Sequence, residues 1–337
     1  MARAVTLSWE GRQRCASSAA SDASEGSPPR QAWSTADGAG WLLEGDNLRV
    51  LRGLSATHAG AVTLAYLDPP FFTNREHAAF LRKAGAPRTT RTRVHAFDDR
   101  WADLPAYLGA LGDRLEAARA LLAPHGSIVV HVDPKTSHYV RVLGDEIFGA
   151  DAFASEIVWR YRRWPSKTPN FQRVHDVLLR WRKDPRCAAP RWNQPYEPLA
   201  ASTLATWGTK KQRAVFAKDG RRARSSSTEE PTAGVPMGDV WEIGVIAPIA
   251  RERTGYPSQK PEALLERLLG ALTDAGDLVV DPYAGSGTTL AVAARMDRGF
   301  LGVDASAVAL QTTRDRLAGL GYPLAERAWR LAAARAS

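Results

Sequence analysis

The 337-residue sequence contains few of the features that mark small secreted proteins or membrane proteins. It has only two cysteines, Cys15 and Cys187, and they lack the closely spaced pairs that a structural zinc site needs. No apolar run approaches the roughly 20 residues that cross a bilayer. Charged residues interrupt every candidate for the apolar core of a secretory signal, namely Arg3, Glu10, Arg12 and Arg14. These features predict a cytoplasmic protein with no metal site and no membrane contact.

Positive charge is concentrated in one segment. The chain has 45 Lys and Arg against 36 Asp and Glu, and residues 155–230 alone hold 17 basic and 7 acidic residues. The rest of the chain is therefore nearly neutral. Such a local excess is typical of a surface that faces phosphate groups. A solvated basic loop region would have the same composition, and charge alone does not separate the two.

After residue 40, apolar stretches of strand length alternate with helical patterns. Residues 1–40 are rich in Ala, Ser and Gly and predict a flexible N-terminal extension. The patterns predict strands over 41–44, 61–67, 127–132, 156–159, 176–181, 278–281 and 300–304. They predict helices over 47–54, 104–122, 136–148, 257–272, 288–295 and 307–317. Residues 72–100 are polar and are expected to form a long loop. The alternation predicts an α/β fold with a doubly wound, mostly parallel sheet.

A glycine-rich turn, Asp281-Pro-Tyr-Ala-Gly-Ser-Gly287, follows one predicted strand. Such a turn lets a ligand approach the backbone and the start of the next helix. Asp304, at the end of the following strand, is placed to bind ribose hydroxyls. Thr288 stands where a P-loop needs Lys, and Leu290 stands where the dinucleotide fingerprint needs its third Gly. A nucleoside without a pyrophosphate, such as S-adenosylmethionine, remains as the predicted cofactor.

A second motif, Asp68-Pro69-Pro70-Phe71, follows the predicted strand 61–67. In isolation such a sequence is most often a turn that ends a strand. Its place after a buried strand favours a functional site, because ligands bind outside the carboxyl ends of parallel strands.

The two motifs together resemble those of the exocyclic-amino DNA methyltransferases, the N6-adenine and N4-cytosine family. The mark of that family is (Asp/Asn/Ser)-Pro-Pro-(Tyr/Phe/Trp), and its glycine motif is Asp-Pro-Phe-x-Gly-x-Gly, with Tyr283 here in place of Phe. Gly255–Pro261 resembles its (Thr/Ser)-x-Lys-Pro helix start, and Glu44–Leu48 resembles its Gly-Asp-x-Leu. Lesser strand motifs match at 126–134, 156–159 and 175–181. The resemblance covers roughly residues 41–317. The motif order resembles that of the group called beta.

The resemblance implies a seven-stranded S-adenosylmethionine-dependent methyltransferase fold with an inserted target-recognition region. The expected methyltransferase domain covers 41–320, followed by a C-terminal tail over 321–337. Within that domain we expect a catalytic half, a target-recognition region and a cofactor-binding half over about 41–181, 160–250 and 255–320.

The resemblance also implies the reaction: methyl transfer to the N6 amino group of adenine in a short duplex DNA sequence, with the base flipped out. Asp68 and the carbonyl of Pro69 would accept hydrogen bonds from the amine, Pro70 would help to hold that carbonyl, and Phe71 would stack on the base. The residues expected at the cofactor are Asp46, Lys260, Asp281, Tyr283, Ala284, Gly285, Ser286, Gly287, Thr288 and Asp304. The hydroxyls of Ser286 and Thr288 are equally suited to capping a helix.

Cations and aromatic side chains alternate in the basic segment, a pattern that suits contact with nucleic acid. The residues predicted to bind DNA are Arg160, Arg162, Arg163, Trp164, Lys167, Lys210, Lys211, Arg221 and Arg222. For Trp159 and Tyr161, a buried strand edge explains the pattern equally well. His131 and His175 lie on predicted strands and are interpreted as core residues rather than catalysts.

Other functions remain open on the sequence alone. Asp before Pro-Pro is only a tendency of adenine enzymes, so N4 methylation of cytosine is the alternative. An RNA amino-methyltransferase and a non-catalytic nucleic-acid-binding protein also remain. Double-stranded DNA is the expected partner. A homodimer, and a restriction endonuclease on a separate chain, are left open as further partners.

Overall fold

The structure, a computed structural model, describes residues 6–9, 26–81, 92–163, 165, 167, 169–207, 214–216, 219, 221–224 and 232–329. Trp164, Lys210 and Lys211, which were predicted to bind DNA, lie outside these residues. The chain divides into two compact units. The first comprises residues 1–192 and 239–337, and the second comprises residues 193–238.

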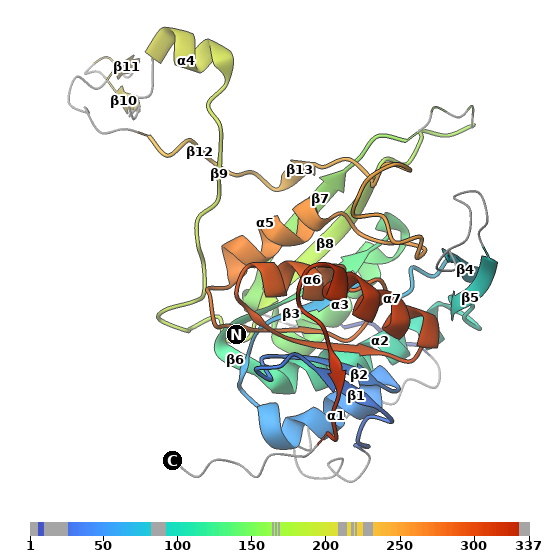
Figure 1. Cartoon of the computed structure of the whole chain (residues 1–337). Coiled ribbons are helices and arrows are strands. Elements are labelled where there is room, and N and C mark those ends of the chain that lie inside the picture. The colour runs from blue at the N-terminus through green and yellow to red at the C-terminus, as the bar shows by residue number, and fades with distance from the viewer. Residues whose placement is uncertain are drawn as a thin grey trace. The chain divides into compact units, whose positions relative to one another are not determined.

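A large sheet runs through the first unit, in the strand order β13-β7-β8-β6-β3-β14-β15-β2-β1-β16 (Figure 1). Its strands are β1 (Ala32–Ser34), β2 (Gly40–Glu44), β3 (Val62–Leu67), β6 (Leu122–Val132), β7 (Phe153–Arg160), β8 (His175–Arg182), β13 (Val240–Glu242), β14 (Leu278–Asp281), β15 (Gly299–Asp304) and β16 (Ala325–Glu326). The central strands β6, β3, β14, β15 and β2 are parallel. The predicted α/β fold is confirmed. Among the described residues the sheet has ten strands instead of seven, because the short strands β13, β1 and β16 extend its edges.

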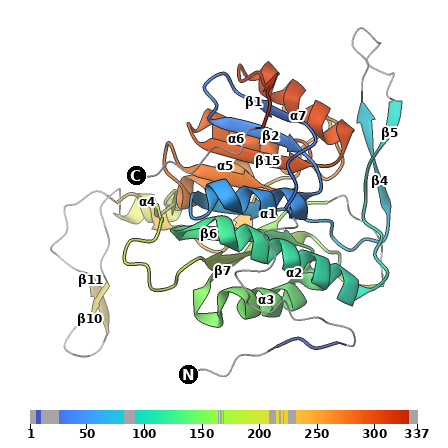
Figure 2. The same ribbon diagram turned by 90° about the horizontal axis from the view of Figure 1, so that it is seen from below.

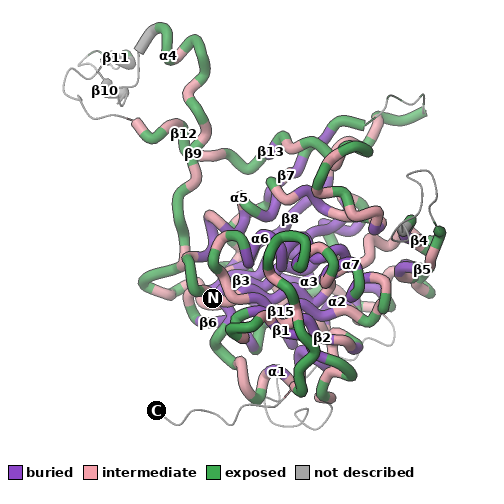
Figure 3. The backbone as a smooth tube through the Cα atoms, viewed as in Figure 1, coloured by how far each residue is buried: buried purple, intermediate pink, exposed green. Residues whose placement is uncertain are grey.

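Helices cover both faces of this sheet (Figure 2). They are α1 (Asn47–His58), α2 (Leu104–Leu121), α3 (Pro134–Phe148), α5 (Glu262–Leu272), α6 (Thr288–Arg295) and α7 (Ala307–Gly319). Successive side chains of a strand point to opposite faces. Leu301 and Val303 of β15 accordingly join the core that contains α1, α2 and α3. Gly302 between them faces α6, so closely that an added Cβ would lie 2.4 Å from Leu290. The arrangement is doubly wound, with the buried residues concentrated in the central strands (Figure 3).

Most helices begin where a side chain caps the first turn. The carboxylates of Asp46, Asp103 and Asp133 accept hydrogen bonds from backbone N–H groups at the starts of α1, α2 and α3. The predicted helix over 257–272 begins later, at Glu262. The backbone before it is irregular, because Gly255 and Ser258 have φ angles of +90° and +57°. This irregular stretch leaves residues 256–260 free to line a cavity.

Two sequence predictions are corrected here. Residues 72–100 are not a continuous loop, because β4 (Glu76–Leu81) and β5 (Thr92–Asp98) pair as an antiparallel hairpin. Their alternation is faint in the sequence, since the residues of the hairpin whose burial is described as complete are the small Ala79 and Ala96. The flexible extension also ends before residue 40, because β1 (Ala32–Ser34) pairs with β2 and is buried.

The second unit comprises residues 193–238, and its described residues form short elements. β9 (Tyr196–Glu197) pairs with β12 (Val235–Pro236), β10 (Ala214–Phe216) pairs with β11 (Arg222–Arg224), and α4 (Ala201–Trp207) lies between. The target-recognition region expected over 160–250 therefore does not coincide with one structural unit. Its first part belongs to the sheet, because β8 pairs between β7 and β6.

Candidate active site

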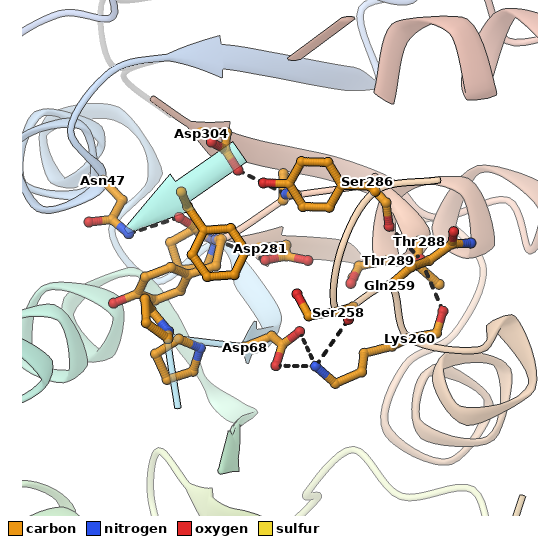
Figure 4. A pocket seen from close by; sticks show the side chains of 18 of the residues that line it. Asn47, Asp68, Ser258, Gln259, Lys260, Asp281, Ser286, Thr288, Thr289 and Asp304 are labelled. Carbon is orange, nitrogen blue, oxygen red and sulfur yellow. Dashed lines mark hydrogen bonds and ion pairs between the residues drawn. The ribbon is translucent and has the colours of Figure 1, made fainter. Parts of the chain in front are cut away.

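Four neighbouring strands of the sheet end in acidic residues at the same edge. Asp68 follows β3, Asp281 and Asp304 end β14 and β15, and Asp46 lies just beyond β2. From β3 the chain passes to β6 on one side, and from β14 it passes to β15 on the other. Such a reversal opens a crevice at the carboxyl ends of the strands. A cavity of about 260 Å³ lies there (Figure 4).

Most of the predicted site residues line this one cavity. All four residues of the Asp-Pro-Pro-Phe motif do so, as do nine of the ten residues expected at the cofactor: Asp46, Lys260, Asp281, Tyr283, Ala284, Gly285, Ser286, Thr288 and Asp304. Gly287 is the exception. It precedes α6 with a φ of +72°, and an added Cβ would lie 2.7 Å from Thr313. Gly287 therefore allows the backbone to form the turn and does not line the cavity.

Asp68 forms an ion pair with Lys260 inside the cavity. The Lys260 Nζ lies 2.7 and 2.6 Å from the two carboxylate oxygens of Asp68, and the two side chains are only 8% and 17% exposed. The same Nζ lies 4.7 Å from the centre of the Phe71 ring. The motif thus presents a hydrogen-bond acceptor beside an aromatic face, the two features needed to hold an amino group attached to a flat ring.

Asp304 fixes the glycine turn. Its Oδ2 accepts a hydrogen bond from the N–H of Gly285 at 2.9 Å, and its Oδ1 accepts one from the N–H of Ser306 at 2.8 Å. Gly285 has a φ of +50°, a conformation that residues with a Cβ rarely adopt. Burial raises the pKa of Asp304 above its usual value. Thr288 is also tied into this turn, since its hydroxyl bonds to the carbonyl of Lys260 at 3.2 Å.

Asp281 lies at the bottom of the cavity. Its Oδ1 accepts a hydrogen bond from the N–H of Tyr283 at 2.9 Å. Burial raises the pKa of Asp281 to about 7, and the nearby charges of Asp68 and Asp304 act in the same direction. The cavity therefore does not carry the full negative charge of all its carboxyl groups at neutral pH.

The turn after β2 is joined to the glycine motif by Asn47, which the sequence analysis did not single out. The Asn47 side chain donates to the carbonyl of Pro282 at 3.0 Å and accepts from Arg114 Nε at 2.6 Å. The neighbouring Asp46 caps α1 and lies 3.3 Å from Arg114. A polar side chain directly after Gly45-Asp46 was the only available signal.

A buried polar cluster lies behind Phe71. His131 is fully buried, with Nδ1 2.9 Å from the Tyr66 hydroxyl and Nε2 3.3 Å from Asp176 Oδ2. The Tyr161 hydroxyl donates to the other oxygen of Asp176 at 2.9 Å. Burial lowers the pKa of His131, which favours the neutral ring. Both ring nitrogens have partners, as expected for a histidine in a core. The sequence analysis did not assign Tyr66 or Asp176 to this cluster.

The predicted DNA-binding residues are placed in several settings. Arg162, Arg163 and Lys167 are exposed on the segment that joins β7 to β8, whereas Arg160 pairs with Glu242 of β13. Trp159 and Tyr161 are buried, so the strand-edge interpretation holds for both. Arg221, which is exposed, and Arg222, which begins β11, belong to the second unit.

Among the residues that the structure describes, no cluster of three or more His, Cys, Asp and Glu side chains is arranged to hold a metal ion. None of the helices described is both long enough and apolar enough to span a membrane.

The crevice brings a carboxylate and an aromatic ring into one cavity with a glycine turn and a second buried acid. Comparison with known proteins identifies the class. Residues 62–315 match the N6/N4 methyltransferase family model, described as DNA methylase. Since the match spans most of the chain, the protein belongs to this family of DNA methylases.

Individual relatives are more distant. Type II methyltransferase M.EcaI of Enterobacter cloacae is 28% identical over 305 residues, covering 76% of this chain and 64% of the relative. Type II methyltransferase M.HpaI of Haemophilus parainfluenzae is 25% identical over 267 residues, covering 79% and 71%. The chain thus spans slightly less than two thirds of M.EcaI.

Solved structures share the fold. The PvuII DNA methyltransferase, a cytosine-N4-specific enzyme, superposes with a TM-score of 0.53 at 17% identity, covering 82% of this chain and 86% of that one. The complex of M1.HpyAVI with S-adenosylmethionine gives a TM-score of 0.50 at 16% identity, covering 82% and 98%.

Proposed function

We propose that this protein transfers a methyl group from S-adenosylmethionine to the N6 amino group of adenine in a short duplex DNA sequence. The observation that carries the proposal is the shared cavity. The acceptor Asp68 and the aromatic Phe71 line the same space as the glycine turn and Asp304. Cofactor and target can therefore meet. Membership of the N6/N4 methylase family supports the chemical class.

The cavity residues fit S-adenosylmethionine. A carboxylate has about four acceptor sites. Backbone N–H groups bond to each oxygen of Asp304 without filling its acceptor sites, and we propose that the rest bind ribose hydroxyls. Gly285 has no Cβ to obstruct a ligand beside the turn. Asp281 and Ala284 line the space expected for the methionine portion. When bound, the cofactor supplies a methyl group that its sulfonium charge has already activated.

The Asp-Pro-Pro-Phe motif is suited to increase the nucleophilicity of the target amine. The lone pair of an exocyclic amine is delocalised into the ring, so the nitrogen is a poor nucleophile. Hydrogen bonds to Asp68 and to the Pro69 carbonyl would pull that nitrogen toward tetrahedral geometry and direct its lone pair outward. Asp68 retains free acceptor sites beside its bonds to Lys260, because each oxygen has two lone pairs. The proton released from the amine passes to Asp68 or to water.

The target base reaches this cavity by leaving the duplex, and Phe71 supplies the ring on which it stacks. The segment joining β7 to β8 is placed to contact the DNA backbone. β7 and β6 both pair antiparallel with β8, so the end of β7 lies at the same edge of the sheet as the carboxyl ends of the parallel strands. Arg162, Arg163 and Lys167 follow that end and are exposed. Their charges support a duplex substrate.

Adenine is preferred over cytosine because the motif begins with Asp, as in adenine enzymes that the sequence resembles. The same pair of acceptors also suits the N4 amine of cytosine, which stays the alternative.

The test is single-molecule sequencing of DNA from a methylation-free host that expresses the wild-type chain, beside a host that expresses Asp68→Ala. We expect modified adenine in one short motif, absent with the variant. Modified cytosine in place of modified adenine would support the same mechanism with cytosine as the target base. Unmodified DNA in both hosts, with well-folded protein that binds S-adenosylmethionine, would contradict the DNA substrate.

A further inference from the structure

The loop that carries the Asp-Pro-Pro-Phe motif lacks backbone N–H donors at two successive residues. Pro69 and Pro70 have no N–H group, so this loop cannot be anchored by backbone donors until residue 71. Just beyond the motif, Phe72 and Asn74 have φ angles of +56°. Asn tolerates this region, but a bulky residue such as Phe72 adopts it only when its surroundings impose it. Something outside the loop must therefore hold it.

One buried carboxylate does so. Asp99 is 1% exposed and directly follows β5, at the base of the hairpin. Its Oδ2 accepts from the N–H groups of Phe71 and Thr73 at 3.2 and 2.8 Å, and from the Thr73 hydroxyl at 2.6 Å. Its Oδ1 accepts from the N–H of Phe72 at 3.0 Å. The first three N–H groups available after the prolines thus converge on a single side chain.

Two further contacts fix Asp99 itself. Its Oδ1 accepts from Trp101 Nε1 at 3.0 Å. Its backbone bonds across to the far end of the loop, with Asn74 N donating to the Asp99 carbonyl and Asp99 N donating to the carbonyl of Arg75, both at 3.0 Å. Hydrogen bonds from both the side chain and the backbone of Asp99 thus join the loop to the β4–β5 hairpin.

We infer that Asp99 is a positioning residue for methyl transfer: it sets the place of the Phe71 ring and of the Asp68–Pro69 acceptors without itself touching the amine. The inference rests on the proposed role of the Asp-Pro-Pro-Phe motif, but it does not depend on whether adenine or cytosine is the target.

The chemistry of the carboxylate makes the inference testable with an isosteric change. In Asp99→Asn one acceptor oxygen becomes an NH₂ group. This group is itself a donor, so it cannot accept hydrogen bonds from the N–H groups that the oxygen bonded. At least one N–H of the loop is then left unpaired in a buried site. The loop shifts, and small displacements of reacting groups reduce rates strongly, by about 10²-fold for a shift of 1 Å.

The experiment compares Asp99→Asn with Asp98→Asn, whose exposed side chain bonds only to Arg100. Turnover is measured on a duplex carrying the motif found by sequencing. Flipping is measured on a second duplex with 2-aminopurine at the target position, which reports the flipped state by its fluorescence but lacks the N6 amino group and is not methylated. We expect Asp99→Asn to lower kcat about 10²-fold and to weaken the fluorescence of the flipped state. Binding of S-adenosylmethionine, measured by calorimetry, should stay close to that of Asp98→Asn, which should resemble wild type.

A second pair of variants separates positioning from folding. Thr73→Val keeps the volume but removes the hydroxyl, which bonds to Asp99 at 2.6 Å and lies 3.1 Å from His77 Nε2, whereas Thr73→Ser keeps both contacts. Thr73→Val should lower kcat more than Thr73→Ser, and its effect should largely disappear when Asp99 is already Asn.

Two results would overturn the inference. One is wild-type kcat and fluorescence in Asp99→Asn; the other is a parallel loss of cofactor binding and thermal stability, which marks a purely structural residue. Asp68→Ala is measured alongside. If that variant turns over normally, the proposed function fails; if it is inactive while Asp99→Asn is normal, only the role of Asp99 fails.

Discussion

The two halves of the cavity are built differently. In the glycine turn, short-range contacts hold the backbone: Asp281 accepts from Tyr283 N, and Gly287 N donates to the carbonyl of Ala284. The tie to Asp304 spans only 19 residues. In the Asp-Pro-Pro-Phe loop, the N–H of Phe71 is bonded 28 residues away, at Asp99, and Asp68 is bonded 192 residues away, at Lys260. The glycine turn is therefore held partly by contacts near in sequence and partly by Asn47, 235 residues away from Pro282, whereas the Asp-Pro-Pro-Phe loop depends on Asp99 and Lys260.

Substitutions in the two halves should change different measurable quantities. If the glycine turn forms the nucleoside pocket as proposed, a change there should affect cofactor binding first. If the Asp-Pro-Pro-Phe loop faces the amine as proposed, a change there should affect turnover first.

The largest expected effect is at Asp68. Asp68→Ala should lower kcat about 10³-fold, because the amine loses its charged acceptor. The dissociation constant for S-adenosylmethionine should change little, since Asp304 and the glycine turn are untouched. Single-turnover kinetics and calorimetry on the same preparation measure the two quantities. A variant that turns over normally, or that loses cofactor binding equally, would remove the distinction between the halves.

The next effect concerns the pH dependence of stability. The pKa of Asp281 is raised from 3.8 to about 7, so the folded state favours its protonated form. The contribution of protonated Asp281 to the free energy of unfolding is complete below about pH 4. It is lost as the pH rises to about 7, a change on the order of 4 kcal/mol. Asp281→Asn is neutral throughout. Its thermal stability relative to wild type should therefore increase between pH 5 and pH 8.

Thermal unfolding without added cofactor measures this difference. Asp315→Asn, which changes an exposed carboxylate on α7, serves as the control and should not gain stability over the same pH range. Parallel pH profiles for wild type and Asp281→Asn would contradict the shift.

A smaller effect is expected at Asp304. Asp304→Ala removes the carboxylate proposed to bind the ribose hydroxyls and should weaken binding of S-adenosylmethionine about 10- to 100-fold. At saturating cofactor, kcat should recover most of its wild-type value, in contrast to Asp68→Ala. Asp315→Ala is the matched surface control. Loss of kcat that saturation does not restore would place Asp304 in the catalytic half instead.

The smallest effect is expected on the surface between β7 and β8. Arg162→Ala and Lys167→Ala together should weaken DNA binding several-fold and reduce the slope of log K against log salt by up to about 2. Arg186→Ala, beyond the opposite end of β8, should leave the slope unchanged. A titration of DNA affinity at several salt concentrations provides the measurement. An unchanged slope in the double variant would mean that this segment faces away from DNA.

Much of this protein could be predicted from its sequence. Buried parallel strands are continuous apolar runs, so β3, β14 and β15 were predicted with nearly correct bounds. The acidic residues and glycines that follow them were identifiable for the same reason, because a strand end and a tight turn are local features. Residues 1–40 and the helix over 257–272 were predicted less accurately, since a three-residue edge strand and an irregular entry leave no periodic signal.

The sequence by itself determined which chemical groups stand at the strand ends: an acid before two prolines, an acid before a glycine turn, and a further acid one strand along. Only the tertiary structure decided which groups meet. It placed Lys260 on Asp68, Asn47 on the backbone of Pro282, and Asp99 under the loop of Phe71. These contacts join segments that no local pattern relates. The sheet order brings the ends of β3, β14, β15 and β2 side by side at one edge, and the separate β4–β5 hairpin places Asp99 against the loop after β3.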